Sequence, residues 1–255
     1  MLEIIKNAFE LTKKNALVLI GVLLTTFLIS FFFSFIIGAF QSMPFVSFIL
    51  NMCSLIFQLY FGVGIMKLML NIVDGKEPEF SEIKPTWSEM VKYLSVGLLL
   101  FLIFMVTFMI TIGVFGLINV LKPGLSTFLS DLVTNPDNLV NYSKQEILYA
   151  VVVFILLAIP SVLFYMRLQF ASYLVIDKKL DLGISINHSF KITKGYLLYI
   201  VLMLFAVVLL NILGVIALFI GLLFTIPMSM LIFILLYRSL EQTYLESHPE
   251  NIPVE

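Results

Sequence analysis

Four long stretches without any charged residue constrain the fold of this chain more than any other feature. They cover residues 16–66, 93–121, 147–166 and 197–237. A helix needs about 20 mainly apolar residues to cross the hydrocarbon core of a bilayer. Apolar residues make up 61% of the chain and charged residues 12%, against about 25% charged in a typical soluble domain. The sequence therefore predicts a polytopic membrane protein, and it excludes a nucleic-acid binder or a disulfide scaffold.

The two longest stretches are too long for one span, so each must fold back on itself. The first contains Gly38, Gln41, Ser42 and Pro44 in quick succession, which is typical of a break between helices. The other long stretch, 197–237, is expected to turn near Gly221. The prediction is an all-α fold with six transmembrane helices, at roughly 16–41, 45–72, 93–121, 147–175, 197–219 and 222–240.

The positions of the positive charges predict the orientation. Six spans place both termini on one side, with the loops that follow the second and fourth spans. That side carries all of the 15 Lys and Arg residues except Lys122 and Lys144. Cytoplasmic segments are enriched in Lys and Arg. We therefore expect both termini in the cytoplasm and residues 122–146 outside.

Segments ahead of three spans resemble one another, which predicts an internal repeat. IIKNAFELTKKNALVL places Phe9 where SINHSFKITKGYLLYI places Phe190, and KPTWSEMVKYLSVG places Trp87 there. Each segment is expected to form an amphipathic helix that lies at the interface and leads into a span. The three aromatic rings are predicted to be buried against the following span. The single membrane domain, residues 1–255, would then consist of three hairpin repeats, at roughly 1–75, 76–176 and 177–245, and a polar tail at 246–255.

Three further segments carry a family resemblance. They are RLQFASYLVIDKKLDLGISINHSFKITKGYLL, GIMKLMLNIVDGKEPEFSEI and FTIPMSMLIFILLYRSLE. Together they resemble uncharacterised bacterial integral-membrane families that are similar to the membrane domain of some glycerophosphoryl diester phosphodiesterases. The resemblance implies a six-span protein of the bacterial cytoplasmic (inner) membrane and carries no agreed activity. The sequence shows no His-rich and Glu-rich soluble stretch that would form the phosphodiesterase domain.

The search for catalytic, cofactor-binding or metal-binding residues returns none. His188 and His248 have no Cys or carboxylate at the spacing of metal ligands, and the sequence lacks the G-x-S-x-G, H-E-x-x-H and P-loop motifs. The predicted spans contain no Asp, Glu or His. Because proton relays and coupling sites usually use such residues inside the membrane, this also argues against an ion-coupled transporter. The chain is expected not to be an enzyme.

Two sets of polar residues remain as candidate sites. Lys67, Arg167 and Arg238 each occur near the end of an even-numbered span. They either extend to the lipid headgroups as anchors or converge to bind a phosphate or lipid headgroup. The second set is neutral and consists of Asn51, Ser54, Gln58 and Ser161. These residues either form hydrogen bonds between helices or line a polar cavity.

Two functions follow from these alternatives. The first is a non-catalytic accessory or scaffold component that binds lipids of the bilayer or membrane-protein partners, and it predicts a bundle without a continuous cavity. The alternative is a small permease or exporter of an amphiphilic or lipid-like substrate, which predicts a pocket lined by Asn51, Gln58 and Ser161. Neither hypothesis involves nucleic acid, since the net charge is −1.

Overall fold

The computed structural model describes residues 1–78, 84–121, 134, 143–217 and 220–248, and every regular element in this part is a helix. The chain divides into two compact units. Unit 1 consists of Met1–Gly97 and Gln169–Glu255, and unit 2 of Leu98–Leu168. Six segments of the described residues are long and apolar enough to cross a membrane. The prediction of an all-α, six-span integral membrane protein is therefore confirmed.

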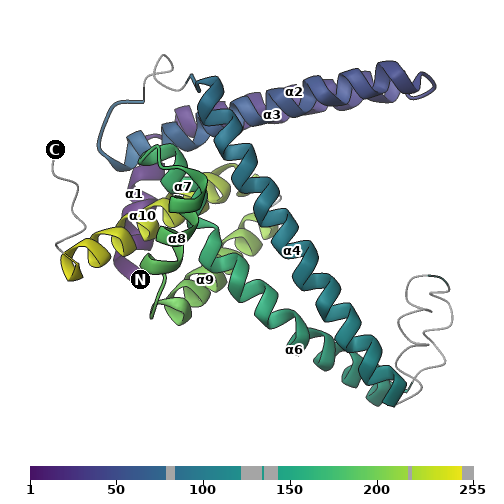
Figure 1. Cartoon of the computed structure of the whole chain (residues 1–255). Helices are drawn as coiled ribbons and strands as arrows, with labels where there is room; N and C mark the ends of the chain where they lie inside the picture. The colour runs from purple at the N-terminus through teal and green to yellow at the C-terminus, as the bar shows by residue number, and fades with distance from the viewer. Residues whose placement is uncertain (79–83, 122–133, 135–142, 218–219, 249–255) are drawn as a thin grey trace. The chain divides into compact units, whose positions relative to one another are not determined.

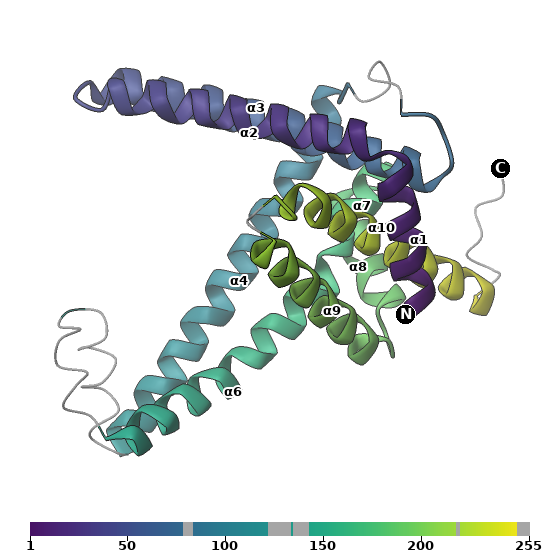
Figure 2. The ribbon, with the colours of Figure 1, turned by 180° about the vertical axis from the view of Figure 1, so that it is seen from behind.

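Unit 1 begins with helix α1 (Leu2–Lys14), followed by a hairpin of α2 (Ala16–Ala39) and α3 (Pro44–Val73). The two hairpin helices lie side by side in both ribbon views (Figures 1 and 2). The predicted break is confirmed, because α2 ends at Ala39 and Pro44 is the first residue of α3. Proline is favoured there, since the first helical position has no intrahelical partner for an N–H group.

Helix α4 (Trp87–Leu121) starts in unit 1 and continues into unit 2, where α6 (Lys144–Leu168) follows. The start of α4 carries a reciprocal capping box. The Thr86 N–H donates to Glu89 Oε2 at 2.8 Å, and the Glu89 N–H donates to Thr86 Oγ1 at 3.4 Å. This pairing satisfies two N–H groups at the helix end. The predicted loop 122–146 lies largely outside the described residues.

The rest of unit 1 consists of α7 (Phe170–Asp177), α8 (Leu182–Ile192), α9 (Leu197–Ile216) and α10 (Leu222–Ser247). The predicted turn near Gly221 is confirmed. A turn at Gln169 divides the predicted fourth span, 147–175, into α6 and α7, and Ile159–Asp177 is still long and apolar enough to cross a membrane. The sixth helix extends beyond the predicted residue 240 and ends at Ser247, so that its last turns consist largely of polar residues.

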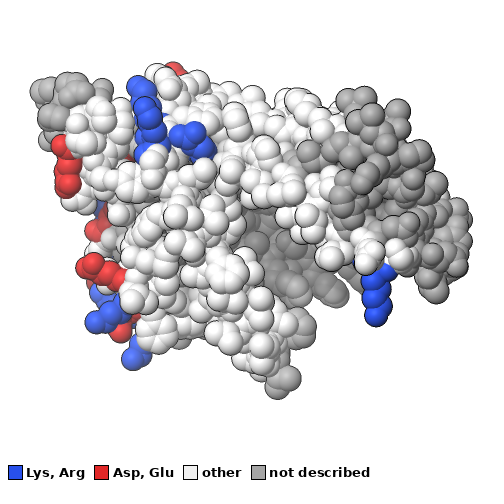
Figure 3. Space-filling view, turned by 90° about the horizontal axis from the view of Figure 1, so that it is seen from below, with Lys and Arg blue, Asp and Glu red and all other residues white. Residues whose placement is uncertain are grey.

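The core of unit 1 surrounds α10. Leu231, Leu236 and Tyr237 of this helix are fully buried, and so is Phe170 of α7. Helix α10 contacts α1, α2, α3, α7, α8 and α9. Most of the α2–α3 hairpin surface is instead apolar and exposed, as a lipid-facing surface requires. Seen from below, the molecule also has a broad face without Lys, Arg, Asp or Glu among the residues drawn in white (Figure 3).

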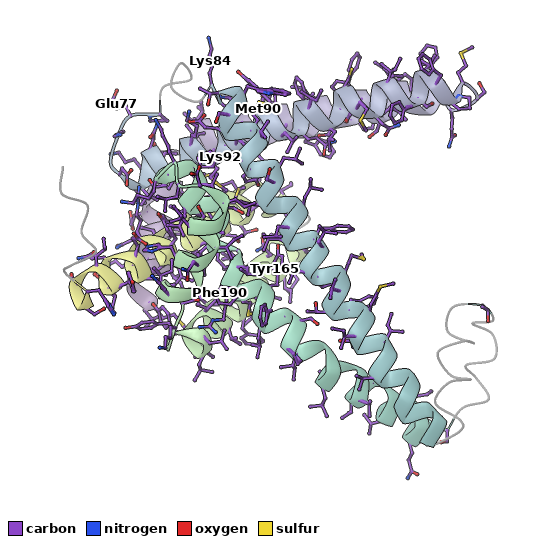
Figure 4. All side chains as sticks on the ribbon, in the orientation of Figure 1. Glu77, Lys84, Met90, Lys92, Tyr165 and Phe190 are labelled. Carbon is purple, nitrogen blue, oxygen red and sulfur yellow. The ribbon has the colours of Figure 1, made fainter. Side chains whose placement is uncertain are left out.

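The structure does not support the predicted equivalence of the three aromatic residues. Trp87 begins α4, with no separate helix over its predicted lead-in segment, and it is 69% exposed. Phe9 is 43% exposed and meets Phe224 of α10 edge to face, at 5.6 Å between ring centroids, instead of the start of α2. Phe190 is half-buried on α8 (Figure 4). The prediction that all three rings are buried is wrong, and the threefold repeat stays a prediction.

Candidate functional site

A cluster of charged side chains joins the ends of α3 and α7 to α10. Asp74 directly follows α3, Asp177 is the last residue of α7, and Arg238 lies on α10. Arg238 donates from Nη1 to Asp177 Oδ2 at 2.6 Å and from Nη2 to Asp177 Oδ1 at 2.9 Å. Its Nη2 also donates to Asp74 at 2.8 and 2.9 Å. This paired geometry is the strongest form of the arginine–carboxylate interaction.

Tyr237 completes this group, which we name the Arg238 cluster (Arg238, Asp74, Asp177 and Tyr237). The Tyr237 hydroxyl donates to Asp177 Oδ2 at 2.7 Å, and its ring stacks on Tyr173 of α7. The side chain of Asp177 is 12% exposed, that of Arg238 26% and that of Asp74 35%. Two carboxylates therefore neutralise one guanidinium in a partly buried position. The geometry provides a structural clamp between three helices.

Three more ion pairs connect neighbouring parts of unit 1. Lys67 donates to Glu89 at 3.2 Å. His188 Nε2 lies 2.8 Å from Glu241 Oε2, between α8 and α10.

The third pair joins Lys92, on the first turns of α4 (Figure 4), to Asp181 ahead of α8. The two side chains meet at 2.7 Å, and Lys92 also donates to the Lys179 carbonyl. The hydrogen bond from Lys92 and its positive charge lower the pKa of Asp181 below its ordinary value.

The three cations predicted to bind a headgroup have different surroundings. Lys67 donates to Glu89 and to the Lys84 carbonyl, whereas Arg238 donates to Asp74 and Asp177. Arg167 lies in the last turn of α6, in unit 2. Their convergence stays a prediction. Two of the three are already neutralised by carboxylates, which reduces their attraction for an added anion.

The neutral residues, which were candidates for hydrogen bonds between helices or for a polar cavity, include two that form local bonds in the described structure. Asn51 is exposed and donates to the Ser47 carbonyl at 2.7 Å. Gln58 Nε2 donates to Ser54 Oγ at 3.0 Å, and Ser54 is buried. Both bonds lie within α3, as is common for polar side chains in spans. Ser161 is buried in unit 2.

An apolar groove lies between α2, α3 and α10, and the sequence did not predict it. Its volume is about 310 Å³. The residues that line it are Leu19, Val22, Leu23, Thr26, Phe27, Ser30, Ile65, Met69, Ile226, Pro227 and Met230. A smaller pocket of about 160 Å³ adjoins it and shares Val22 and Ile65. No sequence pattern marks this groove, because the residues that line it have the composition of an ordinary transmembrane helix.

A second groove, with polar walls, lies between the α8–α9 turn and the last turns of α10. We name it the basic groove, and its volume is about 510 Å³. Its lining residues are Lys191, Ile192, Lys194, Tyr196, Thr243, Tyr244, Ser247 and His248. The sequence shows the two lysines but does not predict the groove, because the residues opposite them lie about 50 positions later in the chain.

Within the described residues, no three His, Cys, Asp or Glu side chains gather as metal ligands would. Comparisons with protein-family models, curated proteins and solved structures find no match to this chain. The features of unit 1 that bear on function are its two grooves.

Proposed function

We propose that this protein is a non-catalytic component of a bacterial cytoplasmic membrane that binds lipid, with an acyl chain held in the apolar groove. The observation that carries the proposal is the groove itself, because an apolar concave surface on membrane-spanning helices matches the chemistry of a hydrocarbon chain. We further propose that both termini are cytoplasmic, on the basis of the distribution of Lys and Arg.

The lining of the apolar groove supports a lipid chain over a polar substrate. Thr26 is one of its two hydroxyl-bearing residues, and its hydroxyl already donates to the Val22 carbonyl at 2.8 Å. Ile226 and Met230 are 38% and 40% exposed, so the groove opens at the surface of α10. A substrate with many hydrogen-bonding groups would lose its water there without recovering equivalent bonds.

The charged residues support a non-catalytic function. Asp74 and Asp177 bind Arg238, Glu89 binds Lys67, and Glu241 binds His188. A general base or nucleophile must be able to reach its substrate. Each of these carboxylates instead holds two helices, or a helix and a loop, together.

The proposal is tested by filling the groove. Val22→Trp adds a large side chain at one of the two positions that line both apolar pockets. We expect the purified variant to retain less phospholipid per protein molecule, as measured by native mass spectrometry and by phosphorus analysis. Ser30→Phe, two turns further along α2, enters the same groove and provides a second variant if the first one is unstable.

Leu28→Trp is the matched control. Leu28 lies on the same helix, is 62% exposed and does not line the groove. We expect this variant to retain as much lipid as the unmodified protein. If both groove variants fold and retain the same amount of lipid as the Leu28 control, the proposed function is wrong.

A further inference from the structure

We propose that the basic groove is a second binding site and that it binds a phosphate group, either on an anionic lipid headgroup or on a soluble phosphate compound. It is separate from the apolar groove, since the two share no residue. The proposal is therefore independent of the proposed lipid chain site.

The two lysines on one wall carry the argument. Lys191 lies in the last turn of α8, which ends at Ile192, and Lys194 follows two residues after that helix. Among the described residues, Lys67, Lys92 and Arg238 each bind a carboxylate. Neither Lys191 nor Lys194 forms an ion pair with a carboxylate of the described residues. Two ammonium groups without a counter-charge at one groove favour an anion.

The backbone between the lysines is well anchored. Thr193 is fully buried, and its hydroxyl donates to the Ser189 carbonyl at 2.8 Å. Gly195 has a φ of 85°, a conformation that glycine adopts readily and other residues rarely do. The turn that carries both lysines is thus fixed, and only the flexible side chains need to be ordered when an anion binds.

Among the described residues that line the groove, the opposite wall has no negative side chain. It consists of Thr243, Tyr244, Ser247 and His248 from the last turns of α10. The nearby Glu241 is buried and lies 2.8 Å from His188. The groove therefore offers two cations and an imidazole, which suits phosphate as a ligand, whereas the hydroxyls of Thr243 and Ser247 already donate to carbonyl groups of α10.

The position of the groove explains why a headgroup is one source of the phosphate. Tyr196, in the lining, directly precedes the apolar helix α9, which begins at Leu197. The lysines therefore lie at the boundary between a span and a polar segment, and lipid phosphates occupy that level of a bilayer. A soluble phosphate compound would reach the same lysines from the aqueous side.

The test compares the Lys191→Gln/Lys194→Gln variant with unmodified protein, both in one detergent. The lipid arm measures retention of added phosphatidylglycerol against neutral phosphatidylcholine by native mass spectrometry. The soluble arm measures the affinity for glycerol 3-phosphate by isothermal titration calorimetry. A basic residue near an anionic surface contributes roughly fivefold in affinity, so we expect a loss of about 25-fold in whichever arm reports the true source.

The matched control is Lys13→Gln/Lys14→Gln. These lysines lie in the last turn of α1, as Lys191 does in α8, so the control makes the same change in charge near a helix end. We expect it to retain full binding. Loss in the lipid arm alone identifies a headgroup, and loss in the soluble arm identifies a free phosphate compound. If the groove variant loses affinity in neither arm, or loses no more than the control, the lysines only complement helix dipoles and the proposal is overturned.

Discussion

Replacing Arg238 by Met tests whether the Arg238 cluster holds unit 1 together. The change preserves an unbranched apolar stem and removes the guanidinium, which leaves Asp74 and Asp177 as two carboxylates without their cation. Breaking a buried ion pair costs about 3–5 kcal/mol, and an exposed pair contributes about 0.2–1 kcal/mol. The carboxylate of Asp177 is 12% exposed and that of Asp74 35%. We therefore expect a loss of about 2–3 kcal/mol in the free energy of unfolding, between these limits.

The assay is thermal unfolding in one detergent at neutral pH, followed by circular dichroism. A loss of this size corresponds to a fall in Tm of about 5–10 °C for a chain of this length. Two further variants test whether the fall in Tm comes from the unpaired carboxylates. Asp177→Asn in the Arg238→Met background should recover part of the stability, because the neutral amide no longer requires a cation. Lys92→Met, at a more exposed ion pair, should leave Tm nearly unchanged. An Arg238→Met protein as stable as the original, or no recovery with Asp177→Asn, would falsify the clamp.

Two other predictions concern the hairpin of α9 and α10 and the orientation of the chain. A Cβ on Gly214 would lie 2.5 Å from Thr225 Oγ1, whereas one on Gly21 would meet nothing within 4 Å. Gly214→Ala should therefore lower stability by about 1–3 kcal/mol, whereas Gly21→Ala should be neutral or stabilising by up to about 1 kcal/mol in the same unfolding assay. In a Cys53→Ser background, Ser143→Cys should react with an impermeant thiol reagent in cells whose outer membrane is permeabilised. Reaction only after lysis would reverse the predicted topology.

Much of the fold follows from local sequence signals, since those signals decide where a helix starts and ends. The break before Pro44 and the turn near Gly221 are such signals, and both were predicted. The capping box of Thr86 and Glu89 is another, and it starts the helix six residues before the predicted third span, which begins at residue 93. The break at Gln169 has no glycine or proline to mark it. The helix that follows it is buried in the core of unit 1.

The contacts of the candidate sites could not be predicted, because they join residues that are far apart in the chain. Arg238 binds Asp74 across 164 positions and Asp177 across 61. In the sequence, Arg238 resembles any cation at the end of a span, and that position favours its interpretation as an interfacial anchor. Periodicity shows which residues share a face of one helix, and it contains no information on which helix lies opposite. The two grooves could not be predicted either, because each is lined by residues from helices that are far apart in the chain.

Helix α10 contributes to both grooves, and its geometry predicts that they bind two different molecules. Met230 lines the apolar groove and Thr243 the basic groove. Thirteen residues of helix separate them, which is about 20 Å along the axis. One leaflet contributes only about 15 Å of hydrocarbon, and the Arg238 cluster lies between the two positions. Because this separation exceeds the thickness of one leaflet, we expect a lipid whose phosphate binds at Lys191 and Lys194 to leave the apolar groove open to a second molecule. We expect two ligands per chain at saturation, with Val22→Trp removing one and leaving the phosphate response intact. A single ligand that is lost in both groove variants would contradict this geometry.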